Sequence, residues 1–210
     1  MTGPARFITL EGGEGAGKST QAKRLAAALE ARGISCLVTR EPGGSPGAED
    51  IRRLLVRGEQ EKWDPQTETL LLFAARADHV ARSIRPALDK GIWVICDRFI
   101  DSTYAYQGVG RGVPIEFIAE FERLVLHGFK PDLTLILDLP VDIGLSRATA
   151  RGADETRFEQ FDRDFHSRLR LAFLDLVRSD PSRCVLIDAG RSADDVASEI
   201  WRAVATRYEL

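Results

Sequence analysis

A glycine-rich segment close to the N-terminus carries the residue types that hold phosphate groups. It follows the apolar run Phe7 to Leu10 and matches the pattern GxxxxGK[ST]. Its residues are Gly12, Gly13, Glu14, Gly15, Ala16, Gly17, Lys18, Ser19 and Thr20. In such a loop, backbone N–H groups surround phosphate oxygens, the lysine neutralises β- and γ-phosphate charge, and the hydroxyl after it ligates Mg²⁺. The segment therefore predicts a site for a nucleoside triphosphate with Mg²⁺.

A second pair of charged residues follows the apolar run Ile92 to Cys96. Asp97 and Arg98 come directly after it, and parallel sheets place their ligands at the carboxyl ends of strands. A carboxylate there is a candidate for the Mg²⁺ shell, and a guanidinium there suits a phosphate. We expect Asp97 to bind the metal together with Ser19, and Arg98 to bind a phosphate.

The elements that must position these residues alternate along the chain. Apolar runs without polar alternation predict five strands, each covered on both faces, and the segments between them have helical spacing. The runs are Phe7 to Leu10, Cys36 to Thr39, Ile92 to Cys96, Leu133 to Leu137 and Cys184 to Ile187. The helical segments are Lys18 to Arg32, Pro65 to Lys90, Pro114 to His127, Asp142 to Arg151, Arg157 to Arg178 and a last one from about Ser192. This alternation predicts an α/β fold with a parallel sheet between helices.

Composition limits the kind of protein. The length of 210 residues fits one domain, residues 1–210. A net charge of −3 lacks the basic field that nonspecific nucleic-acid binding requires, so no nucleic-acid partner is expected. The cysteines Cys36, Cys96 and Cys184 lie in apolar runs, which is typical of reduced core thiols. With neither a signal peptide nor an apolar stretch of membrane-spanning length, we expect no membrane partner and a cytoplasmic location.

The absence of asparagine excludes two classes of nucleotide-binding protein. The chain contains no asparagine, so it has neither the guanine-reading NKxD motif of GTPases nor the metal-binding asparagine of protein kinases. The residues alone leave open a kinase of small substrates, a P-loop ATPase and a regulatory nucleotide-binding module.

Several motifs taken together resemble the thymidylate kinase family over Phe7 to about Phe158. Besides the glycine-rich loop they are Thr39 to Gly44, Phe73 to Arg76, Asp97 to Phe99 and Ser102 to Gly108. The resemblance implies a three-layer P-loop NTPase fold with a five-stranded parallel sheet of order 2-3-1-4-5, helices on both faces and a lid at about residues 147–158. It implies transfer of a phosphoryl group from ATP with Mg²⁺ to dTMP, giving dTDP, by a homodimer. A kinase for another nucleoside monophosphate or for a deoxynucleoside stays as the alternative.

The resemblance also implies roles for individual residues. Those expected to bind dTMP are Glu14, Arg40, Phe73, Arg76, Arg98, Ser102, Tyr106 and Gln107. Arg40 and Arg98 would hold its phosphate, Phe73 and Arg76 would stack on the base and reach a ring carbonyl, and Ser102 and Gln107 would bond the base edge. Glu14 would bind the 3′-hydroxyl and Tyr106 would crowd the 2′ position. Without the resemblance, the apolar run Leu70 to Ala75 indicates a core position for Phe73.

A lid arginine should complete the phosphate site. In the bacterial subgroup the lid supplies it, and Gly15 after Glu14 resembles that subgroup. The residues expected to be catalytic are Lys18, Asp97, Arg98 and Arg151. ATP is expected to contact the loop from Gly12 to Thr20 and Arg147, Arg151 and Arg191. Arg147, Arg151 and Arg157 all lie in or beside the lid, and the choice of the catalytic one stays open.

Overall fold

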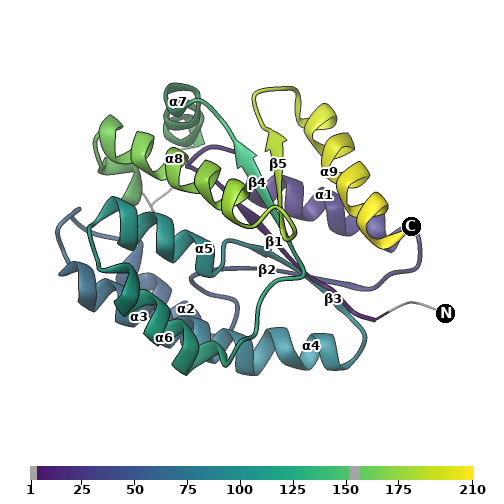
Figure 1. Cartoon of the computed structure of the whole chain (residues 1–210), viewed down its shortest axis with the longest axis horizontal. Coiled ribbons are helices and arrows are strands. Elements are labelled where there is room, and N and C mark those ends of the chain that lie inside the picture. The colour runs from purple at the N-terminus through teal and green to yellow at the C-terminus, as the bar shows by residue number, and fades with distance from the viewer. Residues whose placement is uncertain (1–3, 152–156) are drawn as a thin grey trace.

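The computed structural model describes residues 4–151 and 157–210 and has an open parallel sheet between layers of helices (Figure 1). Its strands are β1 (Phe7–Glu11), β2 (Cys36–Arg40), β3 (Trp93–Asp97), β4 (Leu133–Asp138) and β5 (Cys184–Asp188). They pair in parallel in the order β2-β3-β1-β4-β5. The predicted fold class and strand order are confirmed.

Two helical layers cover the sheet because successive strand residues point to opposite faces. Ile8 and Leu10 pack with α1 and α9, and Phe7 packs with residues of α3 and α6. The helices are α1 (Lys18–Glu30), α2 (Pro46–Leu55), α3 (Pro65–His79), α4 (Arg85–Asp89), α5 (Ile100–Thr103), α6 (Ile115–Leu126), α7 (Val141–Arg151), α8 (Arg163–Ser179) and α9 (Ala193–Tyr208). Short π-helical and 3₁₀ segments are η1 (Val80–Ile84), η2 (Tyr104–Gly110) and η3 (Arg157–Gln160).

The outer strands differ from the prediction of strands covered on both faces. All five residues of β1 are buried, whereas none in β2 is fully buried and Val38 is 39% exposed. β2 lies at an edge of the sheet, where fewer neighbours cover it. Cys96 and Cys184 are buried free thiols as expected, but Cys36 on β2 is only half-buried.

Several helical segments also differ from the predicted ones, among them α5 and η2, which were not predicted. The helix α2, introduced by Ser45 and Pro46, was not predicted. Pro65 to Lys90 is interrupted by η1, just before Pro86, which lacks the N–H that a regular helix requires. Arg157 to Arg178 is divided into η3 and α8, because the Asp162 side chain accepts a hydrogen bond from Phe165 N (2.7 Å) and starts a new helix.

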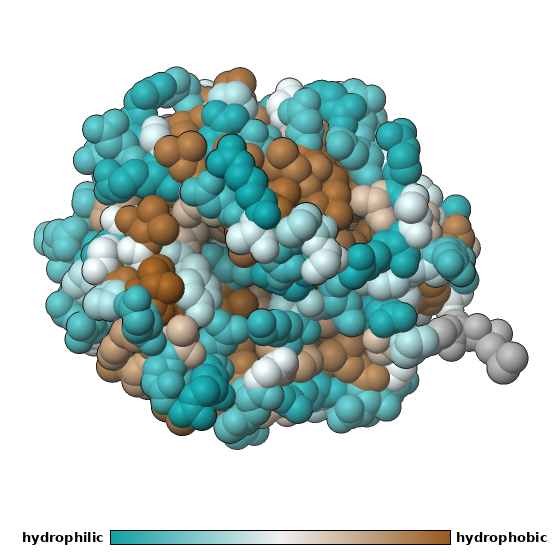
Figure 2. Space-filling model, in the orientation of Figure 1, coloured by the Kyte–Doolittle hydropathy of each residue, from teal (hydrophilic) through white to brown (hydrophobic). Residues whose placement is uncertain are grey.

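The strand register brings the predicted site residues to one edge of the sheet. Arg40 at the end of β2 pairs with Asp97 of β3, and Leu10 of β1 also pairs with Asp97. The loop from Gly12 therefore starts beside Asp97. Figure 2 shows one face of the molecule, where hydrophilic residues lie among limited apolar patches. Among the described residues, no helix is long and apolar enough to cross a membrane.

Candidate active site

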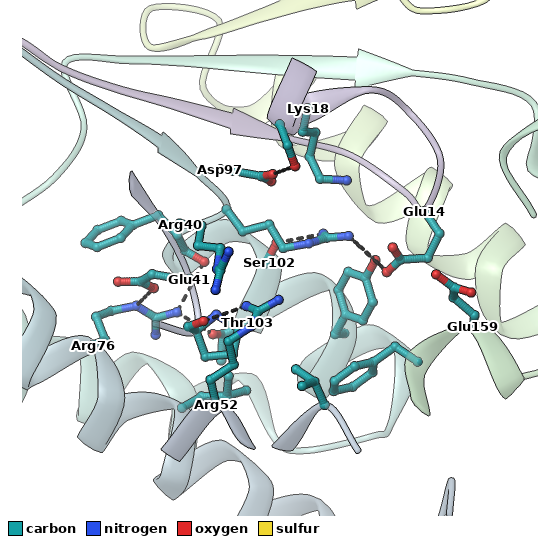
Figure 3. Close-up of a pocket in the computed structure, with 18 of the residues that line it drawn as sticks. Glu14, Lys18, Arg40, Glu41, Arg52, Arg76, Asp97, Ser102, Thr103 and Glu159 are labelled. Atoms are coloured by element: carbon teal, nitrogen blue, oxygen red, sulfur yellow. Dashed lines mark hydrogen bonds and ion pairs between the residues drawn. The ribbon is translucent and has the colours of Figure 1, made fainter. Parts of the chain in front are cut away.

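A cavity of about 450 Å³ opens at the carboxyl ends of β1, β2 and β3 (Figure 3). Thirteen of the residues predicted for the site line it, which are Glu14, Gly15, Gly17, Lys18, Ser19, Thr20, Arg40, Arg76, Asp97, Arg98, Ser102, Tyr106 and Gln107. Ala16 is buried in the core under the loop, and Gly12 and Gly13 border a small neighbouring pocket. The fold thus joins the glycine-rich loop and the motifs of β2, β3 and α3 around a single space.

The shape of the loop requires glycine at two positions. Gly12 has φ 133° and Gly15 has φ 67°, a region that other residues rarely adopt. A Cβ on Gly12 would collide with the carbonyl oxygen of Leu137, and one on Gly15 with that of Gly144. The loop therefore lies directly against β4 and α7.

Lys18 is held inside the loop that precedes it. Its Nζ donates to the carbonyl oxygens of Gly12 (3.1 Å) and Gly13 (2.7 Å). Burial, together with the charge of Arg98, lowers the pKa of Lys18 to about 8, although Asp97 and Glu14 oppose the shift. A phosphate group at this place would add negative charge and favour the ammonium form.

The two residues predicted to bind a metal, Ser19 and Asp97, lie in contact with each other. The Ser19 hydroxyl donates a short hydrogen bond to Oδ2 of Asp97, and both residues line the cavity. Asp97 lies beside Lys18 there (Figure 3). Mg²⁺ prefers hard oxygen ligands and usually takes only one or two from the protein, the rest being phosphate and water. One hydroxyl and one carboxylate in contact fit that requirement, although the described residues contain no cluster of three or more metal-binding side chains.

Arg98 connects β3 to the loop. Its Nη1 donates to Gly12 O (3.0 Å) and Ser102 Oγ (3.1 Å), and its Nη2 donates to Glu14 Oε1 and Tyr106 Oη (both 2.9 Å). Its backbone has φ 71°, a conformation that costs free energy in a non-glycine residue and often marks functional sites. The guanidinium is thereby fixed between the loop and α5.

The charge of Glu14 is stabilised by the same contacts. Burial alone would raise the pKa of Glu14, but the charges of Arg98 and Lys18 and a hydrogen bond from Tyr106 lower it to about 2. Burial raises the pKa of Tyr106 well above its ordinary value, so its phenol keeps the proton that it donates to Glu14 (2.7 Å). A carboxylate that is ionised at every working pH thus lies inside a phosphate-binding loop.

Arg40 and Arg76 approach the cavity from β2 and α3. The Arg40 side chain is about half exposed and pairs with Glu49 (3.2 Å). Arg76 is 2% exposed, and it donates to Glu41 Oε2 (2.7 Å), Phe99 O (3.2 Å) and Thr103 Oγ1 (3.0 Å). Its remaining Nη1 is buried with no hydrogen-bond partner in the part of the chain that the structure describes. Arg76 therefore has an N–H donor that no described residue accepts from.

The structure contradicts the expectation for Phe73. Its ring is 2% exposed, packs against Phe121 in the core and does not line the cavity. Leu72 lines the cavity together with Arg76, because residues four apart share one side of a helix. The apolar run Leu70 to Ala75 does not say which of its residues faces the ligand. It did indicate a core position for Phe73, and that indication is right.

The three lid arginines lie in different surroundings. Arg157 is 0% exposed and pairs with the buried Glu68, so it is part of the interior. Arg147 is exposed on α7 and donates to Ala189 O (3.2 Å). The backbone of Arg151 ends α7, but its side chain lies outside the described residues, as do residues 152–156 of the expected lid. Arg191 pairs with Asp188 and Glu199 beside the end of β5.

Several residues of the site were not predicted. Glu41 and Arg52 line the cavity, and Arg52 Nη1 donates to Pro42 O (2.6 Å) from the unpredicted helix α2. Ser45 and Pro46 are a helix-start signal that would have indicated this helix. His79, given no role from the sequence, is fully buried between Thr39 and Glu41 and so supports the carboxylate that holds Arg76.

Glu11, at the end of β1, was also missed. Its carboxylate is 0% exposed and accepts from Phe99 N (2.7 Å) and Ser102 Oγ (2.5 Å). Burial and the nearby charge of Asp101 raise its pKa to about 7, although Ser102 and Arg98 oppose the shift. The acid fastens the segment after β3 to β1 and so helps to hold Arg98 in place.

The strand order and the loop after the central strand are those of P-loop nucleotide-binding proteins. Guanidinium groups opposite that loop, within the same cavity, provide for a second anionic substrate. The class is therefore that of P-loop nucleotide kinases.

Comparison with known proteins identifies the member of this class. The family model of thymidylate kinase matches residues 10–200. The chain is 55% identical over 204 residues to the thymidylate kinase of Caulobacter vibrioides, covering 97% of this chain and 98% of that one. It is 53% identical over 210 residues to the thymidylate kinase of Pseudomonas fluorescens, covering 100% and 99%. A crystal structure of thymidylate kinase from Ehrlichia chaffeensis matches with a TM-score of 0.79 at 33% identity, over 96% of this chain and 100% of that one. The chain belongs to the thymidylate kinase family.

Proposed function

We propose that this protein transfers the γ-phosphoryl group of ATP to dTMP, giving ADP and dTDP. The supporting observation is that one cavity is lined both by the phosphate loop and by Arg76, whose Nη1 has no hydrogen-bond partner among the described residues. A donor triphosphate and an acceptor nucleotide then lie in line, and an oxygen of the acceptor phosphate attacks the γ-phosphorus as the bond to ADP breaks. No covalent enzyme intermediate or strong general base is needed, since positioning and charge neutralisation supply the catalysis.

The donor side is built by the loop from Gly12 to Thr20. Its N–H groups and the start of α1 bind the phosphates, and Lys18 moves its ammonium from the loop carbonyls to the β- and γ-phosphates. Ser19 and Asp97 hold Mg²⁺, which neutralises charge on the phosphates when it is bound. Arg147 on α7 and Arg191 after β5 also contact ATP in this proposal. Arg151 completes the phosphate site from the lid, because Arg157 is engaged in the interior and Arg147 donates to Ala189 O.

The acceptor side is built by guanidinium groups and by the base pocket. Arg40 and Arg98 bind the acceptor phosphate, and Glu14 and Tyr106 lie at the sugar, where Tyr106 leaves little room for a 2′-hydroxyl. The Nη1 of Arg76 donates to a ring carbonyl, and Ser102 and Gln107 bond the base edge. Leu72 takes the place that Phe73 was expected to have against the ring.

The protein acts as a homodimer in this proposal. Leu70 of α3 and Ile115 and Leu124 of α6 are large apolar side chains that are 41%, 45% and 49% exposed. These two helices contact each other. Such a surface is suited to burial against a second copy. The cytoplasmic location stays a prediction.

An acceptor panel tests the proposed function. Formation of ADP and of nucleoside diphosphate would be measured with ATP, Mg²⁺ and each of dTMP, dUMP, UMP, dCMP and thymidine. We expect dTMP to be the best acceptor and chelation of Mg²⁺ to abolish turnover. Phosphorylation of thymidine in preference to dTMP would favour a deoxynucleoside kinase, and ADP formation without any acceptor would favour an ATPase or a regulatory module.

A further inference from the structure

Glu68 is a buried carboxylate behind the base pocket. It lies on α3, is 0% exposed and contacts three side chains from other parts of the chain. Its Oε2 lies 2.5 Å from Nη1 of Arg157, and its Oε1 accepts from Nε2 of Gln107 at 2.8 Å. The Nε of Arg111 is 3.8 Å from the same Oε1. Two guanidinium groups therefore balance the charge of Glu68, and one amide uses it as an acceptor.

This contact determines which end of the Gln107 amide faces the ligand. A carboxylate only accepts hydrogen bonds, so the NH₂ group of Gln107 must point at Glu68. Gln107 lines the cavity, and its amide oxygen forms no hydrogen bond with the described residues. The amide oxygen of Gln107 is thus a hydrogen-bond acceptor in the cavity, next to the guanidinium donors of Arg76.

Arg157 keeps Glu68 from turning. Its guanidinium donates to the carbonyl oxygens of Glu59 (3.0 Å), Leu55 (3.1 Å) and Gln60 (2.7 Å) while it pairs with the carboxylate. These bonds fix the guanidinium, and the ion pair then fixes the carboxylate. The orientation of Gln107 is set by groups that do not touch the cavity themselves.

We propose that Glu68 is a positioning residue for base discrimination, which fixes Gln107 so that the site accepts a ring N–H and disfavours a base without one. Thymine and uracil carry a hydrogen on N3, whereas N3 of cytosine is an acceptor that would face the Gln107 oxygen. This inference rests on the proposed function, since it concerns the base of the same acceptor nucleotide.

The variant Glu68→Gln tests the proposal. An amide at position 68 either donates or accepts, so Gln107 becomes free to present its NH₂ group to N3 of cytosine. We expect the ratio of kcat/KM for dTMP to that for dCMP to fall about tenfold, the effect of one hydrogen bond made or opposed. We also expect kcat/KM for dCMP to rise in absolute terms, which a merely structural lesion would not cause. Arg157 keeps its carbonyl acceptors in this variant, which favours folding.

Two further variants serve as controls. Asp101→Asn removes another buried ion pair, that with Arg183, and we expect it to lower stability without changing the ratio. Glu68→Asp keeps the charge beside Arg157 but shortens the reach to Gln107, so the ratio should fall here too, even if Glu68→Gln does not fold. An unchanged ratio in a folded Glu68 variant would overturn the proposal.

The outcome for the proposed function is read separately. Wild-type protein without a preference for dTMP over dCMP would contradict the proposed acceptor itself. If wild type has the preference and Gln107→Leu loses it while both Glu68 variants keep it, then Gln107 reads the base and only the role of Glu68 is wrong.

Discussion

The Nη2 atom of Arg98 donates to Oε1 of Glu14 at 2.9 Å, which ties the end of β3 to the phosphate-binding loop. The two side chains are equally shielded, each about one-sixth exposed. The guanidinium that we propose to bind phosphate is therefore already directed at the loop, with an ionised carboxylate as its partner. This preorganisation avoids reorienting the guanidinium during the reaction.

Replacement of Arg98 should accordingly affect turnover. We expect Arg98→Ala to lower kcat by about 10²-fold or more, the scale of a lost charge-stabilising group. Steady-state kinetics on a variant with an unchanged circular dichroism spectrum would measure it. Near-normal turnover would show that the phosphates lie elsewhere.

Binding of ATP should weaken at alkaline pH. The pKa of Lys18 is lowered to about 8, and the triphosphate favours the protonated form, so binding must take up a proton when the pH exceeds that value. The affinity is therefore full below about pH 8 and falls as pH rises, by about tenfold per pH unit while the free lysine is deprotonated. Calorimetric titration of ATP between pH 7 and 9.5 measures this slope, and Lys18→Met should bind weakly without it. A flat profile in wild type would mean that Lys18 does not bind the phosphates.

Leu72 and Phe73 should have opposite effects although they are neighbours. Leu72→Ala removes an apolar wall of the cavity and should raise the KM for dTMP about tenfold. Phe73→Ala removes a core ring and should cost about 3–5 kcal/mol of unfolding free energy. Urea denaturation and acceptor kinetics on both variants separate the two roles. A raised KM confined to Phe73→Ala would restore the ring to the base pocket.

The arginines around the expected lid should also separate into one that affects stability and one that affects turnover. Arg157→Ala leaves Glu68 buried without its closest counter-ion, so it should lose about 3–5 kcal/mol of stability. Arg151→Ala should retain stability and dTMP affinity while kcat falls about 10²-fold. Thermal unfolding and kinetics on these variants and on Arg147→Ala assign the catalytic arginine. If Arg147→Ala alone shows the loss of kcat, the assignment to Arg151 is wrong.

The sequence by itself determined the phosphate-binding loop and the alternation of strands and helices, and the resemblance of its motifs to a family implied the order of the sheet. The loop and the strands depend on local information, since glycine spacing fixes a loop and continuous apolar runs indicate buried parallel strands. The pairing of Arg40 with Asp97 also follows once the strand order is known, because parallel strands end at one edge. Swapping one apolar residue for another in these runs would leave the predictions unchanged.

The tertiary structure alone decided which side of α3 faces the ligand and which charges are interior. Leu72 and Phe73 have the same apolar character, so only packing against Phe121 decides which of them is core. From the sequence Arg157 was a candidate for the catalytic lid arginine, and only the structure shows that it is buried, paired with Glu68 at 2.5 Å across 89 residues of chain. Partners so distant in sequence leave no local pattern, because an ion pair depends on where the chain returns in space and not on its spacing.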